Sequence, residues 1–315
     1  MSLIVGHPGL GKSQLTASIA AIVSSGGEWP VTGERTKTGR VLVLSAEDDP
    51  EDTIRPRMEA AGADLERIEV IDAVRSEDGQ TDLFSLRSHV EQLAGRVLEK
   101  GDVSLVIIDP VTAYLEGSDS HKNADVRALF KPLSKMASDT NTAIVCVSHL
   151  NKANGGSALL RVTGSLAFVA AARAAFLVAL DQDDKDKRLF LPLKNNLSEA
   201  STGMAFYIRP MSLGNRIETS KVVWTNERVT ITADEALNLQ EMRVTRPIDD
   251  AAQFLFYFLG SGPKPMKEVL RRAENEGHTE ITVKRAKKRL GVKSRKSGIS
   301  DGWTWELPEG AIDSD

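Results

Sequence analysis

One short motif in the sequence has residue types and spacing suited to binding phosphate. Residues 6–13, Gly-His-Pro-Gly-Leu-Gly-Lys-Ser, match the P-loop pattern of a glycine, four variable residues and Gly-Lys-Ser. Glycines let backbone N–H groups wrap around phosphates, and the N-terminus of a following helix favours negative charge. We expect Lys12 to reach the β- and γ-phosphates of ATP and the Ser13 hydroxyl to ligate magnesium. The predicted nucleotide-binding residues are Gly6, His7, Pro8, Gly9, Leu10, Gly11, Lys12, Ser13 and Gln14.

A second oxygen ligand is needed to hold the magnesium ion. The apolar run 105–108 ends in Asp109, and open α/β sheets bind their ligands at the C-terminal ends of strands. We therefore assign Asp109 as a magnesium ligand beside Ser13. The alternative is that Asp109 is an ordinary turn residue at the end of a strand.

Hydrolysis also requires a group that orients or deprotonates the attacking water. In many P-loop enzymes this is a glutamate directly after the aspartate, but here that position is Pro110. The apolar run 41–44 is followed by Glu47, which is our candidate for this catalytic role. Asp48 and Asp49 compete with it, although Asp49 precedes a proline and suits the N-cap of a helix.

The elements that position these residues follow from the hydrophobic pattern. Apolar runs without alternation suit a parallel sheet covered on both faces. The expected strands are Leu3–Val5, Val41–Leu44, Ile68–Ile71, Val103–Ile108 and Ala143–Val147, and the expected helices are Gln14–Ser24, Thr53–Ala61, Leu83–Lys100 and Ala124–Thr140. Alternation of strand and helix predicts an α/β fold with a mostly parallel central sheet.

After residue 173 the pattern changes to antiparallel strands. Ala174–Leu180 and Arg188–Leu193 indicate a hairpin, and further strands near 204–208 and 217–224 should extend the sheet at one edge. Because Pro192 cannot donate to a central ladder, we expect the strand that contains it to be an edge strand.

The C-terminal part predicts a separate small domain. Helix candidates at 249–259, 266–276 and 279–290 precede a basic segment that ends in Trp303-Thr304-Trp305. Three helices and a hairpin describe a winged helix-turn-helix. The expected domain boundaries are 1–232 for the α/β domain, 233–247 for a linker, 248–308 for the winged helix and 309–315 for a tail. In the third helix, Ile281, Ala286 and Leu290 are expected to face the core.

Positive charge is concentrated in this small domain although the whole chain has a net charge of −4. Such a basic surface predicts contact with duplex DNA. A basic helix that merely faces solvent is the alternative. The candidate DNA contacts here are Lys284, Arg285, Lys287, Lys288, Lys293, Arg295 and Lys296.

Taken together, the P-loop, the glutamate after the next strand and the Asp-Pro pair resemble the RecA-like ATPase family over roughly residues 1–230. The resemblance is closest to RepA-type hexameric replicative helicases of plasmids and to related phage and mobile-element ATPases, some of which carry similar C-terminal basic domains. Glu47, His149 in Val-Ser-His-Leu-Asn-Lys and Lys194 in Leu-Lys-Asn-Asn match that pattern. The resemblance implies a homo-oligomer, in that family a hexameric ring. Because the P-loop strand begins at the first residues, we expect a preceding segment that helps subunits associate to be missing.

The resemblance also implies that His149 couples nucleotide state to a DNA-contacting loop, although it could be a plain hydrogen-bonded histidine. The following segment 151–164 contains Lys152 and Arg161 and no acidic residue, which suits the backbone of single-stranded DNA. Lys194 would be a basic finger that enters the ATP site of the neighbouring subunit. Arg209 is the second candidate for that finger, and Lys194 could instead be a solvated lysine.

These features predict an ATP-hydrolysing, DNA-associated, helicase-like motor of a plasmid, phage or mobile element. The alternatives are a DNA-binding regulator that uses ATP as a switch, or a RecA-type recombination and repair ATPase. A single cysteine, Cys146, and the absence of a signal peptide or a run of roughly 18 apolar residues predict a cytoplasmic protein with no membrane contact.

Overall fold

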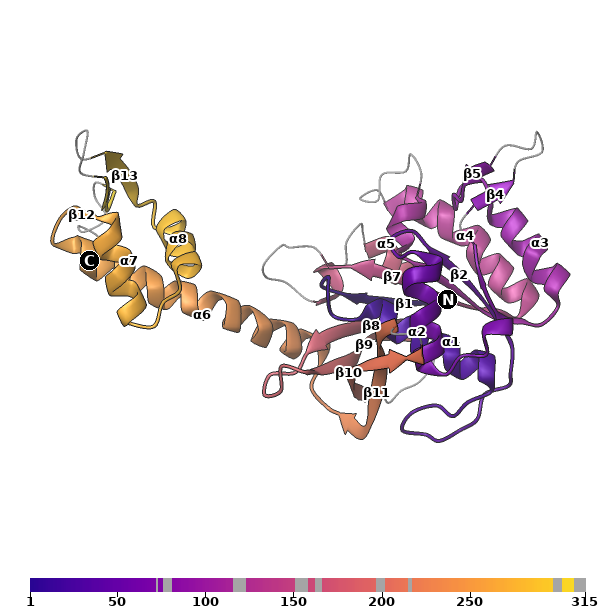
Figure 1. Ribbon diagram of the computed structural model, residues 1–315. Coiled ribbons are helices and arrows are strands. Elements are labelled where there is room, and N and C mark those ends of the chain that lie inside the picture. The colour runs from indigo at the N-terminus through magenta and orange to yellow at the C-terminus, as the bar shows by residue number, and fades with distance from the viewer. Residues whose placement is uncertain are drawn as a thin grey trace. The chain divides into compact units, whose positions relative to one another are not determined.

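A computed structural model of the chain describes residues 1–71, 73–75, 81–115, 123–150, 158–161, 166–196, 202–214, 217–296 and 302–308. The chain divides into one unit over residues 1–237 and a second over residues 238–315 (Figure 1). Among the described residues, no helix combines the length and the hydropathy needed to span a membrane.

A nine-stranded sheet runs through the first unit in the order β11-β10-β9-β8-β1-β7-β6-β2-β3. The strands are β1 (Ser2–Gly6), β2 (Arg40–Ser45), β3 (Ile68–Val70), β6 (Val103–Asp109), β7 (Ala143–His149), β8 (Ala174–Leu180), β9 (Lys187–Asn195), β10 (Gly203–Leu213) and β11 (Ile217–Val229). Pairing is parallel from β8 to β3 and antiparallel from β8 to β11. The predicted α/β fold with a mostly parallel sheet is therefore confirmed, as is its antiparallel extension at one edge.

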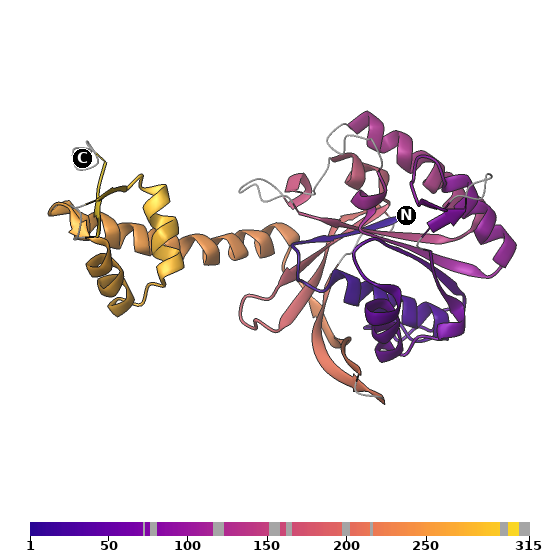
Figure 2. The ribbon, with the colours of Figure 1, turned by 45° about the horizontal axis from the view of Figure 1, so that its top comes forward.

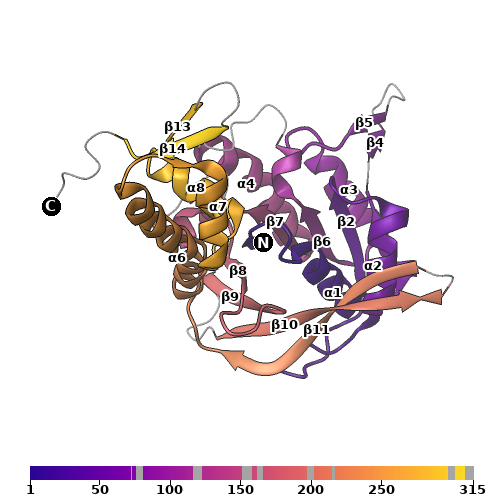
Figure 3. The same cartoon turned by 60° about the vertical axis from the view of Figure 1, so that its left-hand side comes forward.

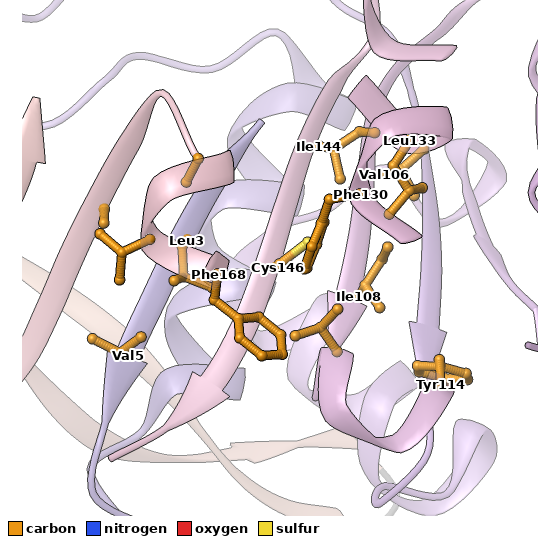
Figure 4. Close-up of a cluster of buried hydrophobic side chains, with 14 of the residues drawn as sticks. Leu3, Val5, Val106, Ile108, Tyr114, Phe130, Leu133, Ile144, Cys146 and Phe168 are labelled. Carbon is orange, nitrogen blue, oxygen red and sulfur yellow. The ribbon is translucent and has the colours of Figure 1, made fainter. Parts of the chain in front are cut away.

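Helices cover both faces of this sheet (Figure 2). One face carries α1 (Lys12–Ser25) and α2 (Arg55–Ala61), and the other carries α3 (Val90–Lys100), α4 (Asn123–Thr140) and α5 (Leu166–Ala171). The central strands are buried because valine, leucine and isoleucine fill both of their faces. Figure 4 shows one of the resulting cores, in which Phe130 and Phe168 pack over strand residues such as Ile108 and Cys146.

Two expectations about the first unit are wrong. The helix expected from residue 83 begins only at Val90, because Phe84 and Leu86 are buried in a preceding turn closed by a hydrogen bond from Ser85 N–H to His89 Nδ1 (3.0 Å). The strand that contains Pro192 is internal, since β9 lies between β8 and β10. Proline is tolerated there because it lies beyond the residues in register with β10, beside an irregularity in the β8–β9 pairing.

A second unit follows with its own core. Its helices are the C-terminal part of α6 (Ala233–Gly260), α7 (Met266–Asn275) and α8 (Glu280–Arg289), and its strands are β12 (Lys264–Pro265), β13 (Lys293–Lys296) and β14 (Trp303–Glu306). The strands form a small sheet in the order β12-β14-β13. Buried residues from all three helices and Trp305 form one apolar cluster.

The segment expected as a linker, 233–247, is helical, because α6 runs through it, and the boundary between the two units falls within it. Thr232 and Glu235 start this helix as a reciprocal cap: Thr232 N–H donates to the Glu235 carboxylate (2.8 Å) and Glu235 N–H donates to Thr232 Oγ1 (3.2 Å). Ile281 was also misplaced, since its side chain is 66% exposed while Val283 and Ala286 face the core. The other two residues expected to face the core do so, since Ala286 is buried and Leu290 packs against the same cluster.

A two-stranded ribbon, β4 (Ala73–Arg75) with β5 (Thr81–Leu83), completes the described strands of the first unit. At the β11 edge of the nine-stranded sheet, β10 and β11 form a long hairpin that passes beside α1 and α2 (Figure 3). This hairpin brings distant parts of the sequence against the P-loop.

Candidate active site

Four adjacent strands of the sheet end at one edge and supply the candidate residues. β1 leads into the P-loop, β7 ends in His149, β6 ends in Asp109, and β2 leads into the turn that contains Glu47. Parallel pairing of β1, β7, β6 and β2 places these ends side by side. The residues singled out along 150 positions of sequence therefore meet where an α/β sheet binds its ligands.

The P-loop owes its path to its glycines. Gly9 and Gly11 have φ angles of 79° and 85°, in the left-handed region that glycine adopts without strain. A side chain at Gly6 would stand 2.7 Å from the carbonyl oxygen of Val178 on β8. Leu10 is buried, packing with Leu15 and the β-strand core, so only its backbone can face a nucleotide.

Lys12 is buried at the mouth of the loop. Its ammonium group donates to the carbonyl oxygens of Gly6 and His7, both at 3.0 Å, and lies 3.3 Å from His149 Nδ1. Burial lowers the pKa of Lys12, while the nearby carboxylates of Asp109 and Glu47 oppose that shift. The Lys12 ammonium group thus lies among carbonyl oxygens and acidic groups. The oxygens of a bound phosphate could take the place of these groups as its partners.

Asp109 and Ser13 are paired directly, the Ser13 hydroxyl donating to the carboxylate. Burial raises the pKa of Asp109 to about 6, against the opposing effects of this hydrogen bond and of the Lys12 charge. A hydroxyl and a carboxylate are hard oxygen ligands of the kind that Mg²⁺ prefers. Among the described residues no group of three or more His, Cys, Asp or Glu could hold a metal. This pair therefore fits an ion that takes its remaining ligands from water and phosphate.

The three acidic residues after β2 have separate partners. Asp49 accepts hydrogen bonds from the N–H groups of Glu51 (2.9 Å) and Asp52 (2.8 Å), so its predicted role as an N-cap is confirmed. Asp48 is paired with Arg57 at 2.5 Å between Oδ2 and Nη1. The Glu47 side chain is 63% exposed, and its Oε1 lies 3.8 Å from Nε2 of His149. Of the three, Glu47 is best placed to accept a proton from water.

His149 bridges the lysine and the glutamate. Burial and the positive charge of Lys12 lower the pKa of His149, while Glu47 acts in the opposite direction. A neutral imidazole can accept a hydrogen bond from the Lys12 ammonium at Nδ1 and present Nε2–H to Glu47. The His149 ring therefore contacts both Lys12 and Glu47.

Lys194 lies away from this site within its own chain. Ala175 pairs with both Leu3 and Lys194, which places Lys194 near the edge where β1 begins. Its Nζ donates to the carbonyl oxygens of Val169 (3.0 Å), Ala170 (3.2 Å) and Ala172 (2.8 Å), at the C-terminus of α5.

Arg209 is exposed on β10, and its guanidinium lies 4.4 Å from the ring centroid of Tyr207. It is the next residue after Ile208, whose side chain packs on Gly11. Arg209 therefore belongs to the part of the hairpin that reaches the P-loop.

The predicted DNA contacts are described only in part. Lys152 lies outside the described residues, and Arg161 ends a short 3₁₀ helix, Ala158–Arg161, with its side chain outside the described part. In the second unit the candidates are exposed, except that Lys287 is half-buried with its Nζ 4.9 Å from the Trp305 ring. Lys284 pairs with Glu280, and Arg295 pairs with Glu306.

Sequence patterns missed Arg57 and Ser220, and they gave no sign that Gln14, which was predicted to bind the nucleotide, links the site to the hairpin. A helical side chain points toward its N-terminus. An arginine early in the helix after β2 could therefore have been expected to reach back to Asp48. The contact with Ser220 has no local signal, because it spans 206 residues.

Parts of this chain are similar to known proteins. Residues 1–155 match the AAA domain family. The chain is 28% identical over 184 residues to the DNA repair protein RAD51 homolog 4 of Bos taurus, a match that covers 54% of this chain and 52% of that protein. A DnaB-like replicative helicase, solved to show its interactions with primase, matches with a TM-score of 0.47 and 13% identity over 66% of this chain and 54% of that one. The chain thus spans about half the length of the curated relative it matches.

Proposed function

We propose that this chain, whose first unit is a RecA-like P-loop ATPase domain, hydrolyses ATP with magnesium. The energy released by hydrolysis would drive an action of the protein on DNA. The observation that carries the proposal is the meeting of Lys12, Ser13, Asp109 and Glu47 at the ends of adjacent strands. Residues 1–155 match the AAA domain family, which supports the ATPase part of this proposal.

The chain's own residues have distinct parts in this reaction. The backbone of residues 6–13 and Lys12 would bind the phosphates, and Ser13 with Asp109 would hold Mg²⁺. When bound, the ion would offset the negative charge of the phosphates. Glu47 would orient the attacking water and accept its proton, and His149, in contact with both Lys12 and Glu47, would sense the γ-phosphate.

A neighbouring subunit is proposed to complete the site. Transition-state charge on the γ-phosphate is commonly stabilised by a basic finger. Lys194 is engaged by three carbonyl oxygens of its own chain, whereas Arg209 is exposed on β10 of the hairpin. We therefore favour Arg209 over Lys194 as the finger in a homo-oligomer, for which a hexameric ring is the arrangement we propose.

For the second unit we propose a winged helix-turn-helix that binds duplex DNA. The order of three helices followed by the β13–β14 hairpin supports this assignment, with α8 as the basic helix and β13–β14 as the wing. Single-stranded DNA would be contacted by the first unit, with Lys152 and Arg161 as candidates.

We propose a helicase-like motor as the leading function, of the kind used in plasmid or phage replication. The second candidate is a recombination or repair ATPase, which the similarity to the RAD51 homolog favours. A forked-duplex strand-displacement assay beside DNA-stimulated ATPase measurements distinguishes them. Unwinding supports the motor, stimulated hydrolysis with filaments on single strands supports repair, and DNA binding without stimulation indicates an ATP-dependent switch.

A further inference from the structure

The hairpin β10–β11 rests on the helix that carries the P-loop at three points. Ile208 on β10 packs so closely on Gly11 that a Cβ there would stand 2.1 Å from its Cδ1 atom. Trp224 on β11 donates from Nε1 to Ser18 Oγ at 3.1 Å. The third contact joins Ser220 on β11 to Gln14, the residue directly after Ser13.

This third contact is part of a polar chain that continues to the magnesium site. Gln14 is 8% exposed, and its amide is satisfied when its nitrogen donates to the Ser220 carbonyl oxygen (2.9 Å) and its oxygen accepts from Ser220 Oγ (2.9 Å). In that orientation the same oxygen accepts from Nε of Arg57 at 3.1 Å. A buried amide with every group bonded holds its neighbours in one arrangement.

Arg57 also contacts Asp48, through a guanidinium nitrogen other than the one that faces Gln14. Its Nη1 lies 2.5 Å from Oδ2 of Asp48, and the two side chains are each 26% exposed. Asp48 lines a small cavity of about 20 Å³ together with Ser13 and Asp109, the pair assigned to magnesium. One planar guanidinium therefore joins a carboxylate beside the magnesium ligands to the amide that holds the hairpin.

The part of the hairpin fixed in this way also carries Arg209. Ser220 is in register with Pro210, and Arg209 is in register with Lys221. A shift at Ser220 therefore moves Arg209 with it.

We propose that Arg57 is a positioning residue that makes the position of the β10–β11 hairpin depend on whether the nucleotide site is occupied. The inference rests on the proposed ATPase function, because it assumes that Mg²⁺ and a nucleotide bind beside Asp48. Arginine suits the role since its fork can bond two acceptors at once, whereas lysine presents a single point charge. Arg57→Lys should therefore keep the pair with Asp48 and weaken the link to Gln14.

Hydrogen exchange of the full chain, followed by mass spectrometry with and without Mg²⁺ and ADP, tests the proposal. In the wild type, bound Mg²⁺-ADP should slow exchange of hairpin amides in 203–213 and 217–229 by about tenfold, the effect of one charged hydrogen bond. In Arg57→Met this protection should fall below about threefold, and Arg57→Lys should be intermediate. The Kd for Mg²⁺-ADP should change less than about threefold in both variants.

Arg55→Met is the matched control, because Arg55 lies on the same helix with an exposed side chain. It should retain the full protection. The proposal is overturned if Arg57→Met shows the same nucleotide-dependent protection as the wild type, or if the wild type binds Mg²⁺-ADP without any protection of the hairpin. A wild-type chain that does not bind Mg²⁺-ADP contradicts the proposed function instead. If Arg57→Met does not fold, Asp48→Ala removes the acceptor at the other end of the same link and should show the same loss of protection.

Discussion

Charged side chains at the candidate site are close enough to influence one another electrostatically. Three carboxylates, those of Glu47, Asp48 and Asp109, face two cations, Lys12 and Arg57, while His149 is driven toward its neutral form. The cluster therefore carries an excess of negative charge whenever Asp109 is ionised. A divalent cation beside Ser13 would offset that excess, and it would also favour the ionised form of Asp109.

Lys12→Ala should abolish ATP hydrolysis while the protein remains folded. Among the described residues, the lysine hydrogen bonds to groups of the P-loop and to His149, so its removal leaves the apolar clusters intact. The measurement is steady-state ATPase activity beside the circular dichroism spectrum and Tm. A folded Lys12→Ala protein with normal turnover would contradict the assignment of the P-loop.

Glu47→Gln should retain nucleotide binding and lose turnover by about 10²-fold or more, the scale of removing a general base. Asp48→Asn should be less damaging to the chemical step, because Asp48 is already paired with Arg57. Single-turnover hydrolysis with ATP in place separates this effect from binding. If Asp48→Asn abolishes turnover and Glu47→Gln does not, the catalytic role belongs to Asp48.

Asp109 should make the stability of the metal-free protein depend on pH. Burial raises its pKa to about 6 from an ordinary value of 3.8, so the folded chain binds this proton more tightly than the unfolded chain. Stability should therefore fall as pH rises from about 4 to 6, by about 2–3 kcal/mol from this group, and then level off.

Asp109→Asn removes that dependence and is the test. In urea unfolding with EDTA, the variant and the wild type should be similar at pH 4, and the variant should be more stable at pH 7.5. Added Mg²⁺ should reduce the difference. A gap that is the same at both pH values would mean that the carboxyl group is not the cause.

The Lys194 ammonium group stabilises α5 by donating to carbonyl oxygens at its C-terminus. A cation that donates to carbonyl oxygens at a helix C-terminus is favoured by the helix dipole and by charged hydrogen bonds. Lys194→Met, which keeps the aliphatic stem, should lower the free energy of unfolding by about 1–3 kcal/mol. Lys185→Met, at an exposed position in the β8–β9 turn, is the control and should change it little.

Mixed oligomers distinguish the two candidates for the finger that acts between subunits. Arg209→Ala mixed with Glu47→Gln should recover some ATPase activity, since some interfaces then pair an intact Glu47 with an intact Arg209. Lys194→Met mixed with Glu47→Gln should recover none beyond the activity of either variant alone. Recovery in the second mixture and none in the first would return the role to Lys194.

The elements also show which features local sequence could reveal. The P-loop, the buried strands and the cap at Asp49 depend on neighbouring residues, so their patterns sufficed. The bonds of Lys194 depend on how α5 packs near β9, and the internal position of Pro192 depends on which strand pairs on its far side. Neither the bonds of Lys194 nor the internal position of Pro192 can be predicted from the spacing of neighbouring residues. Ile281 was misplaced because Val283 offered an equally good apolar face two positions later.

For the whole molecule, the unexpected feature is that α6 belongs to both units. Ala233, Ala236 and Leu237 pack in the first core, and the same helix contributes Phe254 and Leu255 to the second. Residues 233–247 were expected to form a linker, but the cap at Thr232 starts a helix that continues through them. Pro247 removes a single N–H donor from this helix, and residues 233–260 are helical in spite of it.

The second unit should bind duplex DNA with a salt dependence set by its unpaired cations. Eight basic residues lie between Lys284 and Lys296, but Lys284, Arg289 and Arg295 are paired with carboxylates and Lys287 lies over Trp305. The other four basic side chains have no ion-pair partner among the described residues; they are Arg285, Lys288, Lys293 and Lys296. Four phosphate contacts would give a log–log slope of Kd against salt of roughly 3 to 4 in magnitude.

Replacing Arg285, Lys288 and Lys293 by alanine in the full chain should reduce that slope by about one unit for each phosphate that is no longer neutralised. The paired residues Lys284 and Arg295 provide the matched control, because a cation already held by a carboxylate has less charge to offer a phosphate. Their double alanine variant should reduce the slope less than the triple variant does. Fluorescence anisotropy of a labelled duplex across a salt series measures both, and basal ATPase activity should stay unchanged, because the nucleotide site lies within the first unit. A triple variant with the wild-type slope would show that this surface does not bind DNA, and an acidic protein partner would then be the better candidate for it.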